Sequence, residues 1–146
     1  MRTLRTSILF LGKHNSGRSQ LAEAILRHES AGAVTVSSAG LEPTGVNPLV
    51  YTVLEEAGIP ATGQRAKSAK EFLGRASFAE AIIVCRRGDA DCPKLFLGAV
   101  QVRFWEVEDP EAVYAGDPLQ AFRTARDHIA SMVHELVNDR LTPQLT

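Results

Sequence analysis

The amino-acid sequence predicts an α/β fold with a doubly wound parallel sheet. Short apolar runs alternate with segments of helical periodicity, glycines and prolines separate the two kinds of segment, and one run is apolar almost throughout. An almost continuous apolar run is typical of a strand buried on both faces of a parallel sheet. Strands that alternate with helices imply right-handed crossovers, and ligands then bind beyond the carboxyl ends of the strands.

The first half of the chain predicts a strand, a helix, a second strand and a second helix. Residues 6–11 and 33–38 are β-branched and aliphatic runs, which we expect to be strands. Between them, apolar residues recur at helical spacing over 19–28. In the second helix we expect Asn47 as the N-cap, a proline at the first position and Gly58 as the end.

The second half predicts a short helix over 68–74, two further strands over 79–85 and 100–105, and a long last helix that opens at Asp117. We expect that last helix to pack against the sheet through one apolar face. The residues of this face are Phe122, Ala125, Ile129, Val133 and Leu136.

Length and composition predict one soluble domain over residues 1–146, with a frayed tail at 141–146. The chain is 45% hydrophobic and 23% charged, as ordinary globular proteins are. No run reaches the roughly 18 apolar residues of a membrane span, and the apolar run near the start is too short for a signal peptide. We therefore expect a cytoplasmic protein without a membrane role, and the net charge of -1 does not indicate a nucleic-acid partner.

The segment 12–19, G-K-H-N-S-G-R-S, has the composition of an anion-binding loop. It joins a predicted strand to a predicted helix, so backbone amides and the positive end of the helix dipole can converge on one anion. Two glycines let the backbone curl, and the arginine can donate two parallel hydrogen bonds. We predict a site for phosphate, arsenate or sulfate, without metal or cofactor, formed by Lys13, His14, Asn15, Ser16, Gly17, Arg18 and Ser19.

Two other interpretations of this loop are open. The segment satisfies G-x-x-x-x-G-[KR]-S, which is close to the phosphate-binding loop of nucleoside triphosphatases. That interpretation is remote, because arginine replaces the usual lysine and no apolar strand ends in the aspartate that would hold magnesium. The other interpretation is a glycine-containing loop that binds nothing.

Several segments, in order along the chain, resemble the low-molecular-weight tyrosine phosphatase and thioredoxin-coupled arsenate reductase superfamily. They are 10–24, 38–40, 63–68, 85–93 and 108–110. The resemblance covers about residues 6–138 and implies a three-layer α/β/α fold with a four-stranded sheet in the order 2-1-3-4.

The resemblance also assigns roles to individual residues. It implies that Asp109 protonates the leaving oxygen and that Cys85 and Cys92 are paired redox cysteines. It implies a thioredoxin-like protein or a phosphotyrosine protein as partner. Spacing alone indicates two ordinary reduced thiols, because six intervening residues form neither a compact C-x-x-C motif nor a zinc site.

The sequence departs from the superfamily at the residue that begins the loop. The family nucleophile is a cysteine, and Gly12 stands at its position. Removing one member of a covalent mechanism lowers the rate by orders of magnitude, although Arg18, Ser19 and Asp109 remain. Ser16 would need a base, for which His14 is the nearby candidate. We therefore expect an oxyanion-binding protein whose catalysis is impaired.

Two enzymatic alternatives stay open. The protein could be an active arsenate reductase or tyrosine phosphatase in which an experimenter replaced the cysteine of position 12. Alternatively, Cys85 or Cys92 could be the thiol that meets arsenate.

Overall fold

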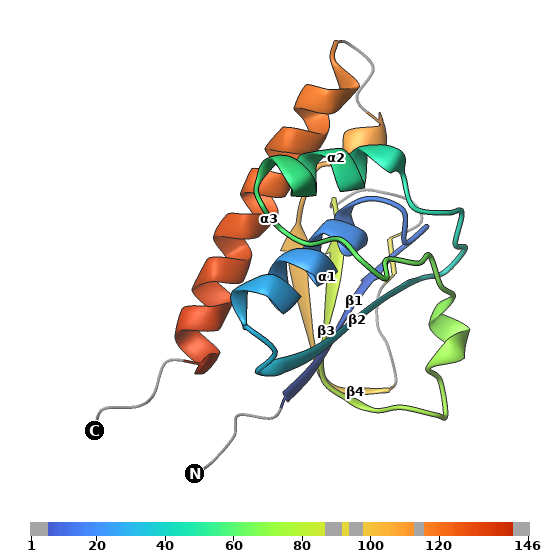
Figure 1. Cartoon of the computed structure of the whole chain (residues 1–146). Helices are drawn as coiled ribbons and strands as arrows, with labels where there is room; N and C mark the ends of the chain where they lie inside the picture. The colour runs from blue at the N-terminus through green and yellow to red at the C-terminus, as the bar shows by residue number, and fades with distance from the viewer. Residues whose placement is uncertain (1–5, 87–91, 94–97, 113–115, 142–146) are drawn as a thin grey trace.

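The computed structural model describes residues 6–86, 92–93, 98–112 and 116–141. The described elements, in chain order, are β1 (Thr6–Gly12), α1 (Arg18–Glu29), β2 (Val34–Gly40), α2 (Pro48–Glu56), the 3-10 helix η1 (Ala69–Glu71), β3 (Phe78–Cys85), β4 (Ala99–Glu106), the 3-10 helix η2 (Pro110–Ala112) and α3 (Pro118–Leu141). The predicted α/β class is confirmed (Figure 1).

The four strands form one parallel sheet in the order β2-β1-β3-β4, as the resemblance implied. Because every pair is parallel, all four strands end at the same edge of the sheet. The register places Gly12 of β1 opposite Gly40 of β2, and Leu11 opposite Ile83 of β3. The residues that follow β1, β2 and β3 are therefore neighbours in space.

Two apolar clusters lie on opposite faces of the sheet. Phe10 and Ile82 face α1 and α3, while their neighbours Leu11 and Ile83 face the side of η1. This alternation follows from the period of two in a strand. α2 packs against both α1 and α3.

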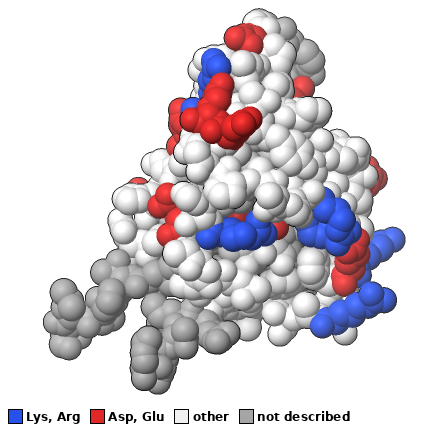
Figure 2. All heavy atoms as spheres, viewed as in Figure 1, with Lys and Arg blue, Asp and Glu red and all other residues white. Residues whose placement is uncertain are grey.

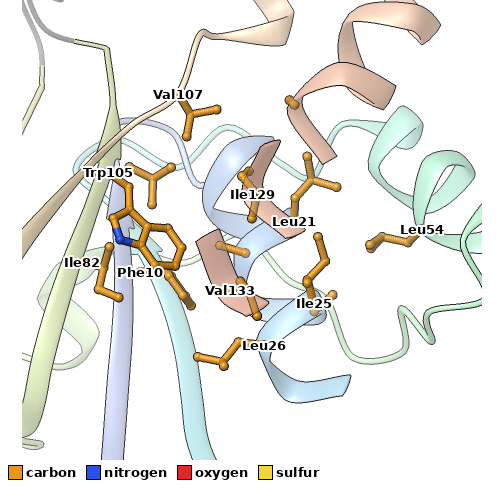
Figure 3. Close-up of a cluster of buried hydrophobic side chains, with 14 of the residues drawn as sticks. Phe10, Leu21, Ile25, Leu26, Leu54, Ile82, Trp105, Val107, Ile129 and Val133 are labelled. Atoms are coloured by element: carbon orange, nitrogen blue, oxygen red, sulfur yellow. The ribbon is translucent and has the colours of Figure 1, made fainter. Parts of the chain in front are cut away.

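The larger cluster lies between the sheet and the three α-helices. Figure 3 shows the side chains of Leu21 and Ile25 from α1 meeting Ile129 and Val133 from α3. The ring of Trp105 packs near that of Phe10, with centroids 5.5 Å apart. Each fully buried side chain of this size contributes about 1.5–3 kcal/mol relative to an exposed one, so this cluster holds α1 rigidly against β1.

The segment 68–74 forms a shorter helix than predicted. Only Ala69–Glu71 is helical, as a 3-10 turn, and Ser68 caps it by accepting from the backbone amide of Lys70 at 3.1 Å. Gly74 has a φ of 75°, which ends any helical continuation. Before this turn, Lys67 is buried and its backbone amide donates to the side-chain oxygen of Asn15 at 2.9 Å, a bond made outside any helix.

The face of the molecule in Figure 2 has no large patch in which all charged side chains have the same sign. Lys and Arg side chains lie beside Asp and Glu side chains there. Among the helices of the described part of the chain, none is long and apolar enough to cross a membrane. Because the net charge of the chain is only -1, attraction of an anion must come from local geometry.

Candidate functional site

The loop 12–19 lies at the carboxyl edge of the sheet, between β1 and the first turn of α1. Pairing on both sides fixes the end of β1, and Arg18 and Ser19 already belong to α1. The N-cap residue is Gly17, which has no side chain to accept hydrogen bonds from the first amides of the helix. These amides and the positive end of the helix dipole are therefore directed into the loop.

Asn15 stabilises the curled shape of the loop through its backbone conformation and its side-chain hydrogen bonds. Its φ is 52°, a left-handed conformation that asparagine tolerates better than most residues. The buried side-chain amide donates to the hydroxyls of Ser19 and Ser38, at 2.9 Å each. Its oxygen accepts from the backbone amide of Lys67, also at 2.9 Å. Asn15 therefore uses its side chain to brace the loop.

Gly40 lies directly behind the loop. A Cβ atom at this position would lie 2.7 Å from the amide nitrogen of Asn15 and 2.7 Å from the carbonyl oxygen of Lys13. Both are backbone atoms, which move only with the loop itself. The glycine of the segment 38–40 is thus required by close contact between two backbones.

A buried ionic network contacts Asn15 through Ser38. Glu23, which is 5% exposed, accepts from the hydroxyl of Ser38 and pairs with Arg27. The ammonium nitrogen of Lys67 lies 3.8 Å from the Glu23 carboxylate and donates to the carbonyl of Arg65 at 2.7 Å. The sequence assigned no role to Glu23 or Lys67, although a glutamate among the apolar residues of α1 is a signal of a buried polar contact.

This network predicts a pH dependence of stability. Burial lowers the pKa of Lys67, and the Glu23 carboxylate opposes the shift. Between the lowered pKa of the folded state and the ordinary value of about 10.5, the unfolded chain binds more protons than the folded one. The free energy of unfolding should therefore increase as the pH rises from the lowered pKa of Lys67 to the ordinary pKa of a lysine.

Urea unfolding at a series of pH values up to 10.5, the ordinary pKa of a lysine, measures this increment. Lys67→Met should lack it, because methionine does not titrate. Identical pH slopes for the two proteins would contradict the assignment.

Arg18 is held over the loop by the segment that follows β4. One of its terminal nitrogens donates to the carbonyl of Val107 at 2.8 Å, and the other lies 3.6 Å from the carboxylate of Asp109. The Arg18 side chain is 13% exposed and that of Asp109 is 35% exposed. Asp109 also accepts from the backbone amide of Glu111 at 2.9 Å. The structure thus brings together Arg18 and Asp109, which are 91 positions apart in the sequence numbering.

Glu111 is a further residue of the site, which the sequence did not single out as such. Its carboxylate accepts from the hydroxyl of Ser16 at 2.8 Å and from the side-chain amide of Asn47 at 2.9 Å. It therefore connects the loop to η2 and to the start of α2. No local pattern predicts this contact, because Ser16 and Glu111 are 95 residues apart.

A cavity of about 320 Å³ opens above the loop. All eight residues of 12–19 line it, including Lys13 and His14, and Lys13 lies 4.0 Å from Glu42. The other lining residues are Val84, Cys85, Arg86, Cys92, Glu108, Asp109, Glu111 and Ala112. Every predicted site residue therefore borders one cavity.

Cys85 and Cys92 are joined by a disulfide, with their Cα atoms 5.9 Å apart. The interpretation from spacing alone, two separate reduced thiols, is therefore wrong. Spacing failed because the strand end at Cys85 and the return of the chain at Cys92 bring the two residues together in space. The disulfide lies in the wall of the same cavity as the loop.

The sequence model of the low molecular weight phosphotyrosine protein phosphatase family matches residues 7–144. The chain belongs to this family. Solved structures of similar proteins share its fold. An arsenate reductase in the phosphate binding state is 30% identical with a TM-score of 0.77, and the match covers 92% of this chain and 98% of that one.

Other similar proteins are arsenate reductases. The glutaredoxin arsenate reductase of Synechocystis is 32% identical over 130 residues, which are 89% of this chain and 95% of that protein. The thioredoxin-dependent arsenate reductase of Corynebacterium glutamicum is 30% identical with a TM-score of 0.71, over 95% of this chain and 63% of that one. The superfamily that the sequence resembled is confirmed, and the chain is arsenate reductase-like or phosphatase-like.

Proposed function

We propose that this protein binds a small tetrahedral oxyanion, phosphate or arsenate, in the loop 12–19, and that its own residues do not supply the nucleophile of the family mechanism. One observation carries this proposal. The helix-end amides and the Arg18 guanidinium border one cavity, while the residue at the start of the loop is Gly12. The site can hold an anion, but it has no thiol at the place where the family reacts.

Each part of the site has a distinct task in binding. Backbone amides of the loop and of the first turn of α1 donate to the oxygens of the anion. A guanidinium carries five N–H donors, so the hydrogen bond from Arg18 to Val107 is compatible with a two-point contact to an oxyanion. The hydrogen bond to Val107 also fixes the orientation of the Arg18 guanidinium before the ligand binds, so less conformational entropy is lost on binding.

Glycine at position 12 favours binding over turnover. A thiolate there would place a negative charge within a few Å of the bound dianion. Like charges at about 4 Å cost on the order of 1–4 kcal/mol at the dielectric constants of bulk water and of protein surfaces. We expect the loop to bind phosphate more tightly than a version with a cysteine thiolate does.

The names of the relatives support a partner for the disulfide. One similar protein is named a glutaredoxin arsenate reductase and another a thioredoxin-dependent arsenate reductase. We propose that a thioredoxin- or glutaredoxin-like protein reduces the Cys85–Cys92 disulfide. The disulfide lies in the wall of the cavity, and this position also favours a second candidate function. In that second function, arsenate held by the loop is reduced at the expense of the two cysteines.

Arg18→Lys tests the binding site. Lysine keeps the positive charge but loses the planar fork and its bond to Val107, so the affinity for phosphate should fall roughly 10- to 100-fold, or about 1.4–2.8 kcal/mol. Titration calorimetry of phosphate and of arsenate against the folded protein measures this change.

Arg75→Lys is a matched control, because Arg75 is exposed and does not line the cavity. Its affinity should equal that of the wild type. If the wild type shows no binding heat at millimolar ligand, or if Arg18→Lys binds as tightly as the wild type, the proposed site is wrong.

A further inference from the structure

The backbone beside Gly12 leaves room for a small group at the base of the loop. A Cβ atom at this position would lie 3.6 Å from the hydroxyl oxygen of Ser19 and 3.7 Å from the carbonyl oxygen of Val84. These are ordinary van der Waals distances, so an added atom displaces nothing. Because Gly12 also lines the cavity, this space can be reached from the ligand side.

The surroundings of this space suit a thiolate. The amino end of α1 and the Arg18 guanidinium both favour negative charge there. The hydroxyl of Ser19 accepts a hydrogen bond from Asn15, so its own proton can be donated to a sulfur or an anion in the loop. The loop therefore retains the groups that would activate a thiol, and the chain itself places no thiol among them.

Cys85 does not occupy this position. Leu11 and Cys85 both belong to the cluster on the η1 side of the sheet, whereas a side chain at residue 12 would point to the opposite side, toward Ser19 of α1. Cys85 is 2% exposed. However, Gly12 and Cys85 line the same cavity, and a Cβ atom at residue 12 would lie 3.7 Å from the carbonyl oxygen of Val84, the neighbour of Cys85, so a sulfur atom that enters beside Gly12 has a path to Cys85.

We propose that a low-molecular-weight thiol from solution enters the cavity beside Gly12 and acts as the missing nucleophile. With this thiol the protein is an arsenate reductase, and Cys85 and Cys92 are its electron donors. This inference rests on the proposed binding of arsenate by the loop. It adds a second substrate to that site, a small monothiol. It also assigns the disulfide in the structure to the oxidised product state.

The reaction begins with the protein dithiol reduced. In the first step the thiol sulfur bonds to arsenic and one As–O bond breaks. The proton of the thiol joins the departing hydroxyl, which leaves as water. The result is an arsenic–thiol adduct in which arsenic is still As(V).

In the second step the Cys85 thiolate attacks the sulfur of the adduct. The S–As bond breaks, its electron pair stays on arsenic, and arsenic leaves as As(III) arsenite after taking up protons. A mixed disulfide between Cys85 and the small thiol remains. Cys92 then attacks the sulfur of Cys85, which forms the Cys85–Cys92 disulfide and releases the small thiol with a proton. Arsenate gains two electrons and the two protein thiols lose two.

A single-turnover experiment tests this sequence. The full chain is reduced, freed of reductant and mixed with arsenate, with or without glutathione. We expect about one arsenite per chain, together with loss of both cysteine thiols, only when glutathione is present and in excess over a protein-free control. Cys92→Ser should stop at the mixed disulfide, visible as the mass of one glutathione added to the protein.

Two variants at position 12 complete the test. Gly12→Ala places a methyl group in the thiol space and should slow arsenite formation roughly tenfold or more, while calorimetry still detects phosphate binding. Gly12→Cys should remove the need for glutathione. Arsenite formation without glutathione in the wild type would overturn the proposal and support direct attack by Cys85.

Equal rates for Gly12→Ala and wild type would also overturn it. If the protein binds phosphate but forms no arsenite in a glutathione-dependent way, this inference is wrong and the proposed function stands. If phosphate does not bind, the proposed function itself is wrong.

Discussion

Replacing Gly12 by cysteine is expected to give this protein an arsenate-reducing activity that needs no added thiol. The new Cβ atom would make only ordinary contacts, at 3.6 Å from the Ser19 hydroxyl oxygen and 3.7 Å from the Val84 carbonyl oxygen. The thiolate would sit at the amino end of α1, where the dipole and Arg18 lower the pKa of a thiol. The Asp109 carboxylate lies 3.6 Å from Arg18, and we propose that it protonates a departing oxygen in this variant.

The expected gain is on the order of a hundredfold or more over the wild type without thiol, because it restores one member of a covalent mechanism. Arsenite formation with a regenerating disulfide reductant measures it, and hydrolysis of p-nitrophenyl phosphate serves as a second assay. Gly12→Ser is the control, since a hydroxyl of nearly the same size is a poor nucleophile without a base. A folded, phosphate-binding Gly12→Cys variant that stays silent in both assays would show that other parts of the site are also inactive.

Replacing Gly40 by alanine is expected to abolish oxyanion binding and to destabilise the fold. The new methyl carbon would lie 2.7 Å from backbone atoms of Lys13 and Asn15. Relief of this collision must move the loop away from β2, which breaks the bracing contacts of Asn15 with Ser38 and Lys67. Overpacking of this kind costs about 1–3 kcal/mol.

Urea unfolding and phosphate calorimetry measure the two effects of Gly40→Ala. Gly12→Ala is a well-matched control, because Gly12 and Gly40 pair across β1 and β2 and receive the same added carbon. At Gly12 the contacts are ordinary, so this variant should keep its stability within about 0.5 kcal/mol. A Gly40→Ala variant that unfolds and binds phosphate like the control would show that the loop adapts freely.

The fold was largely predictable because its signals are local. In the part of the chain that the structure describes, apolar runs predicted the four strands, helical periodicity predicted α1 and α3, and cap residues predicted α2. The predicted bounds differ from the observed ones by one or two residues at most of the ends that were assigned. The segment 68–74 was less predictable, since it is short and only the Ser68 cap and the left-handed Gly74 mark its ends.

The site was predictable only in its central loop. The residues 12–19 are contiguous, and their amides, glycines and arginine can be read from the chain. Glu111, Gly40 and the Lys67 ammonium contribute through contacts across the fold, and no spacing along the sequence encodes them. The disulfide between Cys85 and Cys92 was implied by family resemblance and contradicted by spacing, and the structure joins the two sulfurs.

By itself, the sequence determined the alternation of strands and helices and the anion-binding composition of one loop. These are properties of neighbouring residues, which local propensity and residue chemistry settle. That Gly12 stands at the position of a nucleophilic thiol is what the family resemblance implies. Only the tertiary structure decided that Arg18, Asp109 and the disulfide border the same cavity, and that residue 12 has room for an added group. Such contacts arise when a parallel sheet brings distant strand ends to one edge, and only the packed fold sets the distances between them.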